Sequence, residues 1–244
     1  MPIQTLSGKS ALVTGGARRI GREIALELAR AGADVSLTYL KSKAEAAQTV
    51  QDIEALGRRA QAIECDVRSE GSVRKAVAAA ATFHGRIDLL VNNAGVFESV
   101  PLDQITLDQW NTVFETNARG PFLMTREAIA HLRQARGRVI NIGSLGGIHA
   151  WTGHAHYCAS KAALHMLTQA MAKAFAPEVS VNCVAPGWID LGESSLEGAA
   201  RFAARTPMKR NGTAADVAEA VLFFATNTGY VTGQIVAVDG GLGL

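Results

Sequence analysis

Cysteine is scarce in this sequence and scattered. Cys65, Cys158 and Cys183 are the only three in 244 residues, and no two have the CxxC spacing of a zinc or redox site. An odd number at irregular spacing does not suit a disulfide framework, so we expect reduced thiols in a cytoplasmic protein. Cys158 adjoins a tyrosine discussed below, and small apolar packing is favoured over a nucleophilic role for it.

Long apolar runs and long runs of one charge are also missing. No stretch approaches the roughly 18 uninterrupted apolar residues of a membrane span, and residues 1–10 contain no signal-peptide core, so neither membrane insertion nor secretion is expected. The net charge is only +2 and no basic run exceeds ARR or GRR, so nucleic acid is not an expected partner. Hydrophobic residues make up 48% of the chain, which is enough to build a large core.

The sequence does contain a regular alternation of apolar, strand-like segments with helix-like segments. Strands are expected at 9–14, 34–40, 60–67, 87–95, 138–144, 179–187 and 234–241, and helical stretches between them include 107–116 and 118–132. Strands that are apolar on both faces are typical of a parallel sheet covered by helices on both sides. The pattern predicts one α/β domain over 1–244, a doubly wound seven-stranded parallel sheet that binds ligands at the carboxyl ends of its strands. Residues 188–212 are expected to be irregular and to shape the substrate pocket.

Three residues form a candidate catalytic group. Tyr157 and Lys161 stand four residues apart at the start of an expected helix, so they share a face about 5–6 Å apart. The ammonium would stabilise the phenolate and lower the pKa of Tyr157 from about 10, which suits general acid–base catalysis. Ser144 precedes Tyr157 by thirteen residues, at the end of an expected strand. A Tyr four residues before a Lys is common on exposed helices, and the serine and the rest of the chain favour the catalytic interpretation.

A glycine-rich turn, TGGARRIG at 14–21, joins the first expected strand to the first expected helix. Gly15 permits a tight turn, Gly21 permits the helix to pack closely on the strand, and the helix N-terminus would attract a pyrophosphate. The alternative is a plain turn with no ligand. In this position between strand and helix, a dinucleotide-binding loop is favoured.

The second expected strand does not end in the acidic residue that usually holds the ribose 2′-hydroxyl of NAD. Tyr39, Lys41 and Ser42 stand there instead, and Arg18 and Arg19 lie across the same corner. Three cations and a hydroxyl, with no carboxylate, suit a 2′-phosphate and favour NADP(H). The alternative is that these cations are merely solvated.

With these features in place, the sequence resembles the short-chain dehydrogenase/reductase family over essentially its whole length. The matching motifs are TGGARRIG, Asp66-Val67, NNAG at 92–95, Asn117, Ser144, the Tyr157/Lys161 pair and Pro186-Gly187. The resemblance implies a single-domain Rossmann fold and an enzyme that transfers a hydride between a nicotinamide and a carbonyl or secondary alcohol. It also implies a homotetramer, with a dimer as the fallback.

The family implies a role for each matching residue. Tyr157 would protonate the carbonyl oxygen, Ser144 would polarise it, and Lys161 would hold the nicotinamide ribose. Asn117 would anchor a water that relays protons to Lys161, and Asp66 would meet the adenine. The full cofactor set implied is Gly15, Ala17, Arg18, Arg19, Ile20, Gly21, Tyr39, Lys41, Ser42, Asp66, Val67, Asn93, Ala94, Gly95, Tyr157, Lys161, Pro186, Gly187 and Ile189.

The sequence departs from the family pattern at two positions. Arg19 replaces the middle glycine of TGxxxGxG, a variant found in the NADPH-dependent pteridine-reductase branch. That branch has an aspartate in place of the catalytic serine, whereas this chain has Ser144, so Arg19 informs on the cofactor and not on the substrate. Leu191 stands where a threonine normally contacts the cofactor. A pteridine-type reductase remains an alternative.

The most similar well-known subfamily is 3-oxoacyl-[acyl-carrier-protein] reductase. Its members dock an acidic carrier on two arginines. Arg136 lies beside the first of these positions, but Pro177-Glu178 occupies the second, where an acid would repel the carrier.

Two interpretations of other residues stay open. His149, His154 and His156 crowd the approach to Tyr157, but no other ligand completes a metal set, so no metal is expected. A non-catalytic NADP(H)-binding sensor is the second functional hypothesis, and the intact catalytic group argues against it.

Three aromatic residues on segments that face the substrate in the family imply an apolar pocket: Phe97, Trp151 and Trp188.

Overall fold

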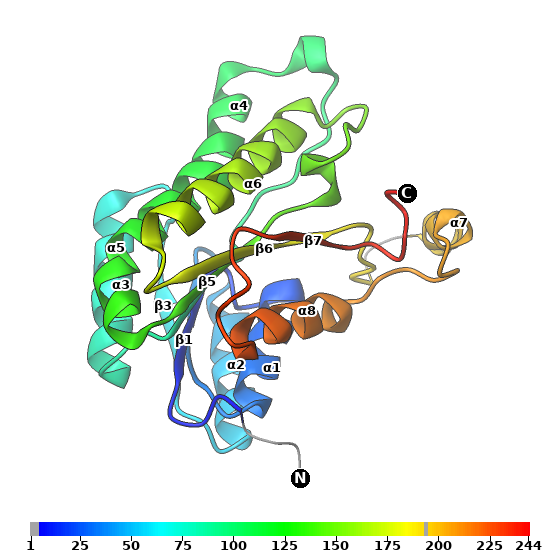
Figure 1. Ribbon diagram of the computed structural model, residues 1–244. Coiled ribbons are helices and arrows are strands. Elements are labelled where there is room, and N and C mark those ends of the chain that lie inside the picture. The colour runs from blue at the N-terminus through cyan, green and yellow to red at the C-terminus, as the bar shows by residue number, and fades with distance from the viewer. Residues whose placement is uncertain (1–4, 193–194) are drawn as a thin grey trace.

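The computed structural model describes residues 5–192 and 195–244, which form one seven-stranded parallel sheet with helices on both faces (Figure 1). The strands are β1 (Ser10–Val13), β2 (Asp34–Tyr39), β3 (Ala60–Glu64), β4 (Leu89–Asn92), β5 (Arg138–Ile142), β6 (Ser180–Pro186) and β7 (Ile235–Val238). Their order is β3-β2-β1-β4-β5-β6-β7, and every neighbouring pair is parallel. The order reverses between β1 and β4, which is where a doubly wound sheet binds its ligand. The predicted fold class is confirmed.

Helices cover the sheet in two layers, each with its own hydrophobic core. The helices are α1 (Arg19–Arg30), α2 (Lys43–Ala55), α3 (Glu70–His84), α4 (Leu107–Phe114), α5 (Gly120–Ala135), α6 (Ala155–Phe175), α7 (Leu196–Arg205) and α8 (Ala214–Thr226). Side chains of α1, α2 and α8 pack on one face, and those of α3, α5 and α6 pack on the other. Because both faces of the central strands are buried, those strands are mostly apolar, and the buried polar side chains of Asn92 and Asn141 are hydrogen-bonded to each other. Among the helices described, none is long and apolar enough to cross a membrane.

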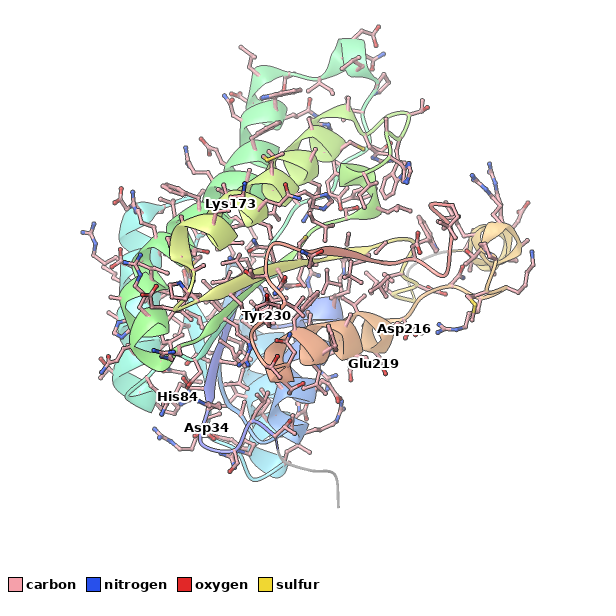
Figure 2. The ribbon with its side chains drawn as sticks, viewed as in Figure 1. Asp34, His84, Lys173, Asp216, Glu219 and Tyr230 are labelled. Carbon is pink, nitrogen blue, oxygen red and sulfur yellow. The ribbon has the colours of Figure 1, made fainter. Side chains whose placement is uncertain are left out.

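Charged side chains gather at the amino ends of the strands, away from the expected ligand edge. Asp34 at the start of β2, labelled in Figure 2, accepts a hydrogen bond from Arg58 at 2.7 Å. Asp88 precedes β4, is 3% exposed, and forms ion pairs with Lys9 and Arg86. These carboxylates bond to the segments that precede β1, β3 and β4, so this edge of the sheet has a structural role.

The two helices expected at 107–116 and 118–132 are joined without a break. A π-helical turn, Glu115–Arg119, connects α4 to α5, and the Gly120 N–H donates to the Glu115 carbonyl. Thr106 and Gln109 cap the start of α4 with a reciprocal pair of side-chain bonds. Single π turns inside helices are frequently found at functional sites. Here the π turn contains Asn117.

The expectation of an irregular segment over 188–212 is wrong in part, because α7 lies inside it. Ser195 caps this helix by accepting the Gly198 N–H at 3.1 Å. Phe202 of α7 stacks on Trp188 with ring centres 3.8 Å apart and planes 6° from parallel. A helix this short is stabilised mainly by such tertiary contacts, which a sequence pattern does not show.

Candidate active site

The glycine loop lies between β1 and α1 and is shaped for a phosphate group. Gly15 has a φ of 64°, a conformation that favours glycine. A Cβ added at Gly21 would overlap the Gly15 carbonyl and the Asn93 side-chain amide, so only glycine fits there. No side chain caps the first turn of α1, which starts after Arg18 and contains no acid. The helix therefore presents its first backbone N–H groups and positive dipole end to an anion.

Hydrogen bonds from two neighbouring strands hold this loop. The Thr14 hydroxyl oxygen accepts from the backbone N–H groups of Asn93 and Ala94, both at 2.9 Å, and Asn93 Nδ2 donates to the Thr14 carbonyl at 2.8 Å. On the other side, the Gly15 N–H donates to Thr38 Oγ1 at 3.2 Å. The NNAG motif thus supports the glycine loop. Thr14 belongs to the predicted motif and Thr38 does not, but neither side chain was predicted to support the loop.

The corner expected to receive the 2′-phosphate is built from the starts of α1 and α2 and the end of β2. Arg18 and Lys41 are exposed, and Ser42 stands at the N-cap of α2. Arg19 has a φ of 54°, so an arginine here adopts a conformation that L-residues disfavour. That backbone explains why glycine usually occupies this position in the family. Retaining a guanidinium there despite the strain is consistent with a role for its charge.

Asp66 and Val67 follow β3 at the same edge. The Asp66 carboxylate pairs with Arg68 at 2.8 Å, and that hydrogen-bonded guanidinium holds the pKa of Asp66 below its usual value. Val67 is buried against Gly120, just after the π turn. Contact of Asp66 with an adenine stays a prediction.

Ser144, Tyr157 and Lys161 come together at the carboxyl end of β5. Ser144 caps a short 3-10 turn, Leu145–Gly147, and its Oγ accepts the Gly146 N–H at 3.0 Å. Tyr157 lies in the first turn of α6, and Lys161 lies one turn further along the same face. Lys161 Nζ donates to the Ile142 carbonyl at 2.8 Å and lies 5.8 Å from the centre of the Tyr157 ring.

The expected lowering of the pKa of Tyr157 is not found. Burial raises that pKa, because it disfavours the phenolate, and a hydrogen bond with Ser144 only partly offsets the effect. Lys161 gives its bond to a backbone carbonyl, and burial lowers its own pKa from 10.5 to about 8. Tyr157 therefore holds its proton at neutral pH, which is the state required of a proton donor.

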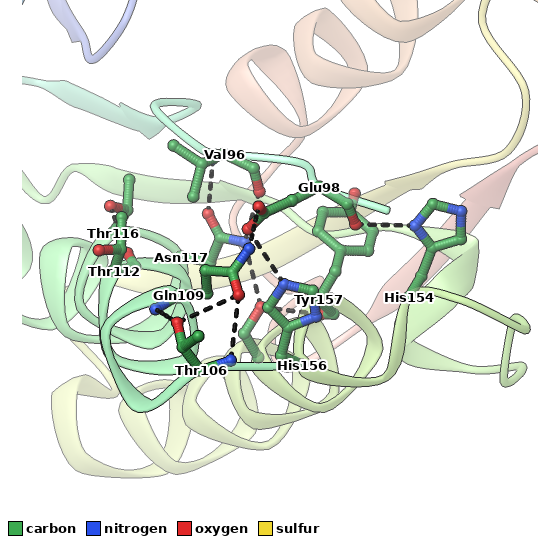
Figure 3. A network of polar contacts seen from close by, with 11 residues as sticks. Val96, Glu98, Thr106, Gln109, Thr112, Thr116, Asn117, His154, His156 and Tyr157 are labelled. Carbon is green, nitrogen blue, oxygen red and sulfur yellow. Dashed lines mark hydrogen bonds and ion pairs between the residues drawn. The ribbon is translucent and has the colours of Figure 1, made fainter. Parts of the chain in front are cut away.

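Asn117 is fully buried in the π turn, and its side chain is hydrogen-bonded to the loop after β4. Its Nδ2 donates to the Val96 carbonyl at 2.9 Å and to Ser160 Oγ at 3.1 Å, while its Oδ1 accepts the Val96 N–H at 2.9 Å (Figure 3). A Cβ on Gly95 would lie 3.2 Å from Asn117 Oδ1 and 3.7 Å from Lys161 Nζ. The structure thus brings Asn117, Gly95 and Lys161 together. The role of Asn117 in holding a water stays a prediction, and its side chain is already satisfied.

Aromatic rings surround Tyr157. Phe97 meets it edge to face at 4.8 Å and stacks on His154 at 4.6 Å, while Trp151 lies 6.2 Å from Tyr157 on near-parallel planes. Phe97 is 58% exposed, so this wall borders solvent. The third expected aromatic residue, Trp188, stacks on α7 as described above.

Glu98 ties this wall to α4 and α6. Its carboxylate accepts from Gln109 Nε2 at 2.6 Å and faces Nε2 of the buried His156 at 3.4 Å, and its carbonyl bonds His154 Nδ1 at 2.9 Å (Figure 3). Sequence reasoning missed Glu98 and Gln109, because they are far from the histidines in the chain. Within the described residues, no three His, Cys, Asp or Glu side chains are grouped as metal ligands.

The segment after β6 completes the site. The Gly187 N–H donates to the Val238 carbonyl at 3.0 Å, and a Cβ on Gly187 would overlap Asp239. Ile189 forms an isolated bridge with Gly212. Most of the predicted site residues therefore lie on strand ends, loops and helix starts at the carboxyl edge of the sheet, and Asn117 reaches them from the π turn between α4 and α5.

Comparison with known proteins gives consistent results. A family model described as enoyl-(acyl carrier protein) reductase matches residues 15–243. A 3-oxoacyl-[acyl-carrier-protein] reductase FabG of Staphylococcus epidermidis is 36% identical, with 96% of this chain and 98% of the relative covered. A short-chain dehydrogenase of Burkholderia cenocepacia, solved in complex with NADP, is 40% identical with a TM-score of 0.93, covering 98% of this chain and all of that one. A blue fluorescent protein from a metagenomic library, solved with NADPH, is 39% identical with a TM-score of 0.91, covering 98% of this chain and 99% of that one.

The fold and site are those of a Rossmann-type oxidoreductase acting on a CH–OH or C=O group. The chain belongs to the short-chain dehydrogenase/reductase family.

Proposed function

We propose that the protein is an NADP(H)-dependent reductase of small ketones. The observation that carries the proposal is the convergence of Ser144, a protonated Tyr157 and a buried Lys161 beside a glycine loop shaped for a dinucleotide. When bound, the nicotinamide supplies the hydride. The residues of this chain bind, orient and protonate.

Ser144 and Tyr157 act on the carbonyl oxygen of the substrate. Ser144 Oγ accepts the Gly146 N–H, which holds the hydroxyl beside Tyr157. A carbonyl oxygen bound between the two hydroxyls would take over the hydrogen that Ser144 shares with Tyr157 and would be polarised by it. The Tyr157 hydroxyl gives its proton to the same oxygen as negative charge develops. Lys161 is placed to hold the ribose and to restore the proton of Tyr157 afterwards. A non-catalytic NADP(H)-binding sensor is disfavoured, because binding the cofactor alone requires no serine that activates a carbonyl.

The choice of NADP(H) rests on the cationic corner formed by Arg18, Arg19 and Lys41. Two similar solved proteins are described as complexes with NADP and NADPH. A 2′-phosphate there would form charge-assisted hydrogen bonds with guanidinium groups. Titration should show NADPH preferred over NADH by at least about tenfold in Kd, or about 1.4 kcal/mol. Equal affinities would remove this part of the proposal.

The residues around the proposed substrate site favour a free, apolar ketone over one that is linked to a carrier protein. Phe97 and Trp151 provide aromatic contact beside Tyr157. Arg136, beside the first position where the related carrier-dependent subfamily uses an arginine, and Glu178, at the second, are both exposed. The negative charge of Glu178 opposes an acidic carrier. We assign residues 188–212, including α7, to the substrate loop.

A 3-oxoacyl-[acyl-carrier-protein] reductase is the second candidate, supported by the identity to the Staphylococcus relative. The two candidates separate in one comparison, acetoacetyl linked to the carrier against acetoacetyl linked to a small thiol. Equal kcat/KM for the two supports the ketone reductase, whereas a carrier preference of about a hundredfold supports the second candidate. A pteridine-type reductase is disfavoured by Ser144.

We further propose a homotetramer, with a dimer as the fallback. Exposed apolar side chains occur on α4 and α5 at Leu107, Trp110 and Phe122, and on α6 and β7 at Met166 and Val236. β7 is also an edge strand, and edges left open invite pairing. A light-scattering mass near the 25.7 kDa of one chain would reject both assemblies.

The activity itself is tested with a panel of aryl, alkyl and cyclic ketones while NADPH absorbance is followed. Turnover of at least one ketone at a rate above about 1 s⁻¹, typical of enzymes, supports the proposal. Tight NADPH binding with no turnover across the panel would support the sensor instead.

A further inference from the structure

His165 lies directly beneath the turn that carries Ser144. Tyr157, Lys161 and His165 are spaced by four residues on α6, so they form one stripe along the helix. The first two belong to the proposed catalytic group. The third is buried, with 7% of its surface exposed, although an unpaired buried histidine is costly.

The imidazole contacts both ends of the turn. The Ser144 backbone N–H donates to His165 Nε2 at 3.4 Å. At the other end, Cε1 and Nδ1 of the ring lie against Gly147. Because Nε2 accepts a hydrogen bond, the neutral ring carries its hydrogen on Nδ1.

The glycines on either side of Ser144 leave room for this ring. A Cβ on Gly143 would overlap His165 Nε2, and a Cβ on Gly147 would lie 2.6 Å from its Cε1. Neither position can carry a larger residue while the imidazole is there. The turn and the histidine thus fit one another closely, which a histidine acting only as filler does not require.

The surroundings keep the ring neutral. Burial and, to a smaller extent, the nearby charge of Lys161 lower the pKa of His165 to about 4. From β6, Cys183 is the titratable group beside Gly143, and burial raises the pKa of its thiol to about 12, so it adds no charge. A neutral ring is required, because a protonated Nε2 could not accept the Ser144 N–H.

The geometry points to His165 as the positioning residue of Ser144. By accepting the Ser144 N–H and packing against Gly147, it fixes the backbone from which the Ser144 hydroxyl reaches the substrate carbonyl. The inference deepens the proposed ketone reduction and rests on it. Displacing a polarising group by even about 1 Å can cost up to a hundredfold in rate, so a loosened turn should slow turnover without weakening cofactor binding.

The test compares two variants of similar size. His165→Leu removes the acceptor of the Ser144 N–H, whereas His165→Gln keeps an amide oxygen that can accept it. We expect kcat to fall about tenfold in His165→Leu, and to recover to within about threefold of wild type in His165→Gln. KM and the NADPH Kd should stay within about twofold in both. Wild-type kcat in His165→Leu, or no recovery in His165→Gln, would overturn the assignment.

A double-mutant cycle shows whether His165 acts through Ser144. In a Ser144→Ala background, His165→Leu should cost less than about twofold in kcat, because the group that it positions is already gone. The same tenfold loss in both backgrounds would mean a general disturbance of the fold and would refute the inference. Met171→Ala, a change at another buried residue of α6, is the matched control, and it should lower Tm but leave kcat unchanged.

One measurement on the wild type needs neither turnover nor a variant. Nitrogen-15 NMR of the His165 imidazole should show a neutral ring with its hydrogen on Nδ1 between pH 6 and 8, as expected from a pKa of about 4. A charged ring, or the hydrogen on Nε2, would overturn the proposal even if His165→Leu does not fold. Failure of the wild type to reduce any ketone, with the NMR result as expected, would instead refute the proposed function alone.

Discussion

Replacing Lys161 with methionine should make the protein more stable at neutral pH while abolishing its proposed activity. The ammonium is buried, and its Nζ donates a hydrogen bond to the Ile142 carbonyl. Burial lowers its pKa from 10.5 to about 8. Methionine is close in length and carries no charge, so it can fill the same space.

The pKa shift sets the size of the effect. At about 1.4 kcal/mol per pKa unit, folding with Lys161 charged costs about 3 kcal/mol at pH 7. Removing that charge stabilises the variant by the same amount, but the variant leaves the Ile142 carbonyl without a hydrogen-bond donor, which costs about 1–3 kcal/mol. The net stabilisation of Lys161→Met at pH 7 is therefore about 1 kcal/mol, or roughly 2–4 °C in Tm for a chain of this length.

The sign changes with pH. The wild type loses the cost of burying a charged Lys161 as pH rises from about 8 to 10.5, because Lys161 is then neutral in the folded protein. The variant cannot gain in this way, so its advantage should shrink by about 3 kcal/mol over that window and reverse. Thermal or urea unfolding of both proteins at pH 7, 9 and 10.5 measures it. A stability difference that does not vary with pH would refute the reasoning.

Lys173→Met is the matched control. Lys173 lies on the same helix and is exposed (Figure 2). Its replacement should leave the pH dependence of stability the same as in wild type.

Three further predictions concern the cofactor. Arg19→Gly should relieve a backbone strain of about 1–2 kcal/mol and so keep or raise Tm, yet it should reduce the NADPH over NADH preference about tenfold in cofactor titrations; an unchanged preference would remove Arg19 from the site. Gly21→Ala should weaken NADPH binding at least about tenfold, because its Cβ has no room, whereas Gly71→Ala in open space on α3 should not; equal effects would contradict the loop geometry. The kcat/KM for NADPH, which reports on the free enzyme, should fall above pH of about 8 as Lys161 loses its charge, and a level profile to about pH 9.5 would contradict this role.

The architecture was predictable because the sequence alternates buried strands with helices. The ends of the strands were harder to predict than the architecture, because apolar residues continue past them. Cys65 and Val67, for example, are buried after β3 has ended. The helix α7 was missed although Ser195 at its N-cap is a local helix signal, and the stacking of Phe202 on Trp188 that holds it is a tertiary contact.

The members of the candidate site were predictable from motif and spacing, but their electrostatics were not. A spacing of four residues places Lys161 near Tyr157, yet it reveals neither the burial of both nor the bond from Lys161 to the Ile142 carbonyl. The direction of the Tyr157 pKa shift was therefore wrong. His165 was equally hidden, because its partners Ser144 and Gly147 lie far from it in sequence.

The most direct test of the central claim is the turnover of Tyr157→Phe on a ketone that the wild type reduces. The change removes one hydroxyl, so the fold and the NADPH affinity, measured separately by fluorescence, should be retained. Loss of the general acid should lower kcat by about 10²–10⁴-fold. Turnover like that of the wild type would mean that the proton comes from another group, and that this stretch of α6 is not the active centre.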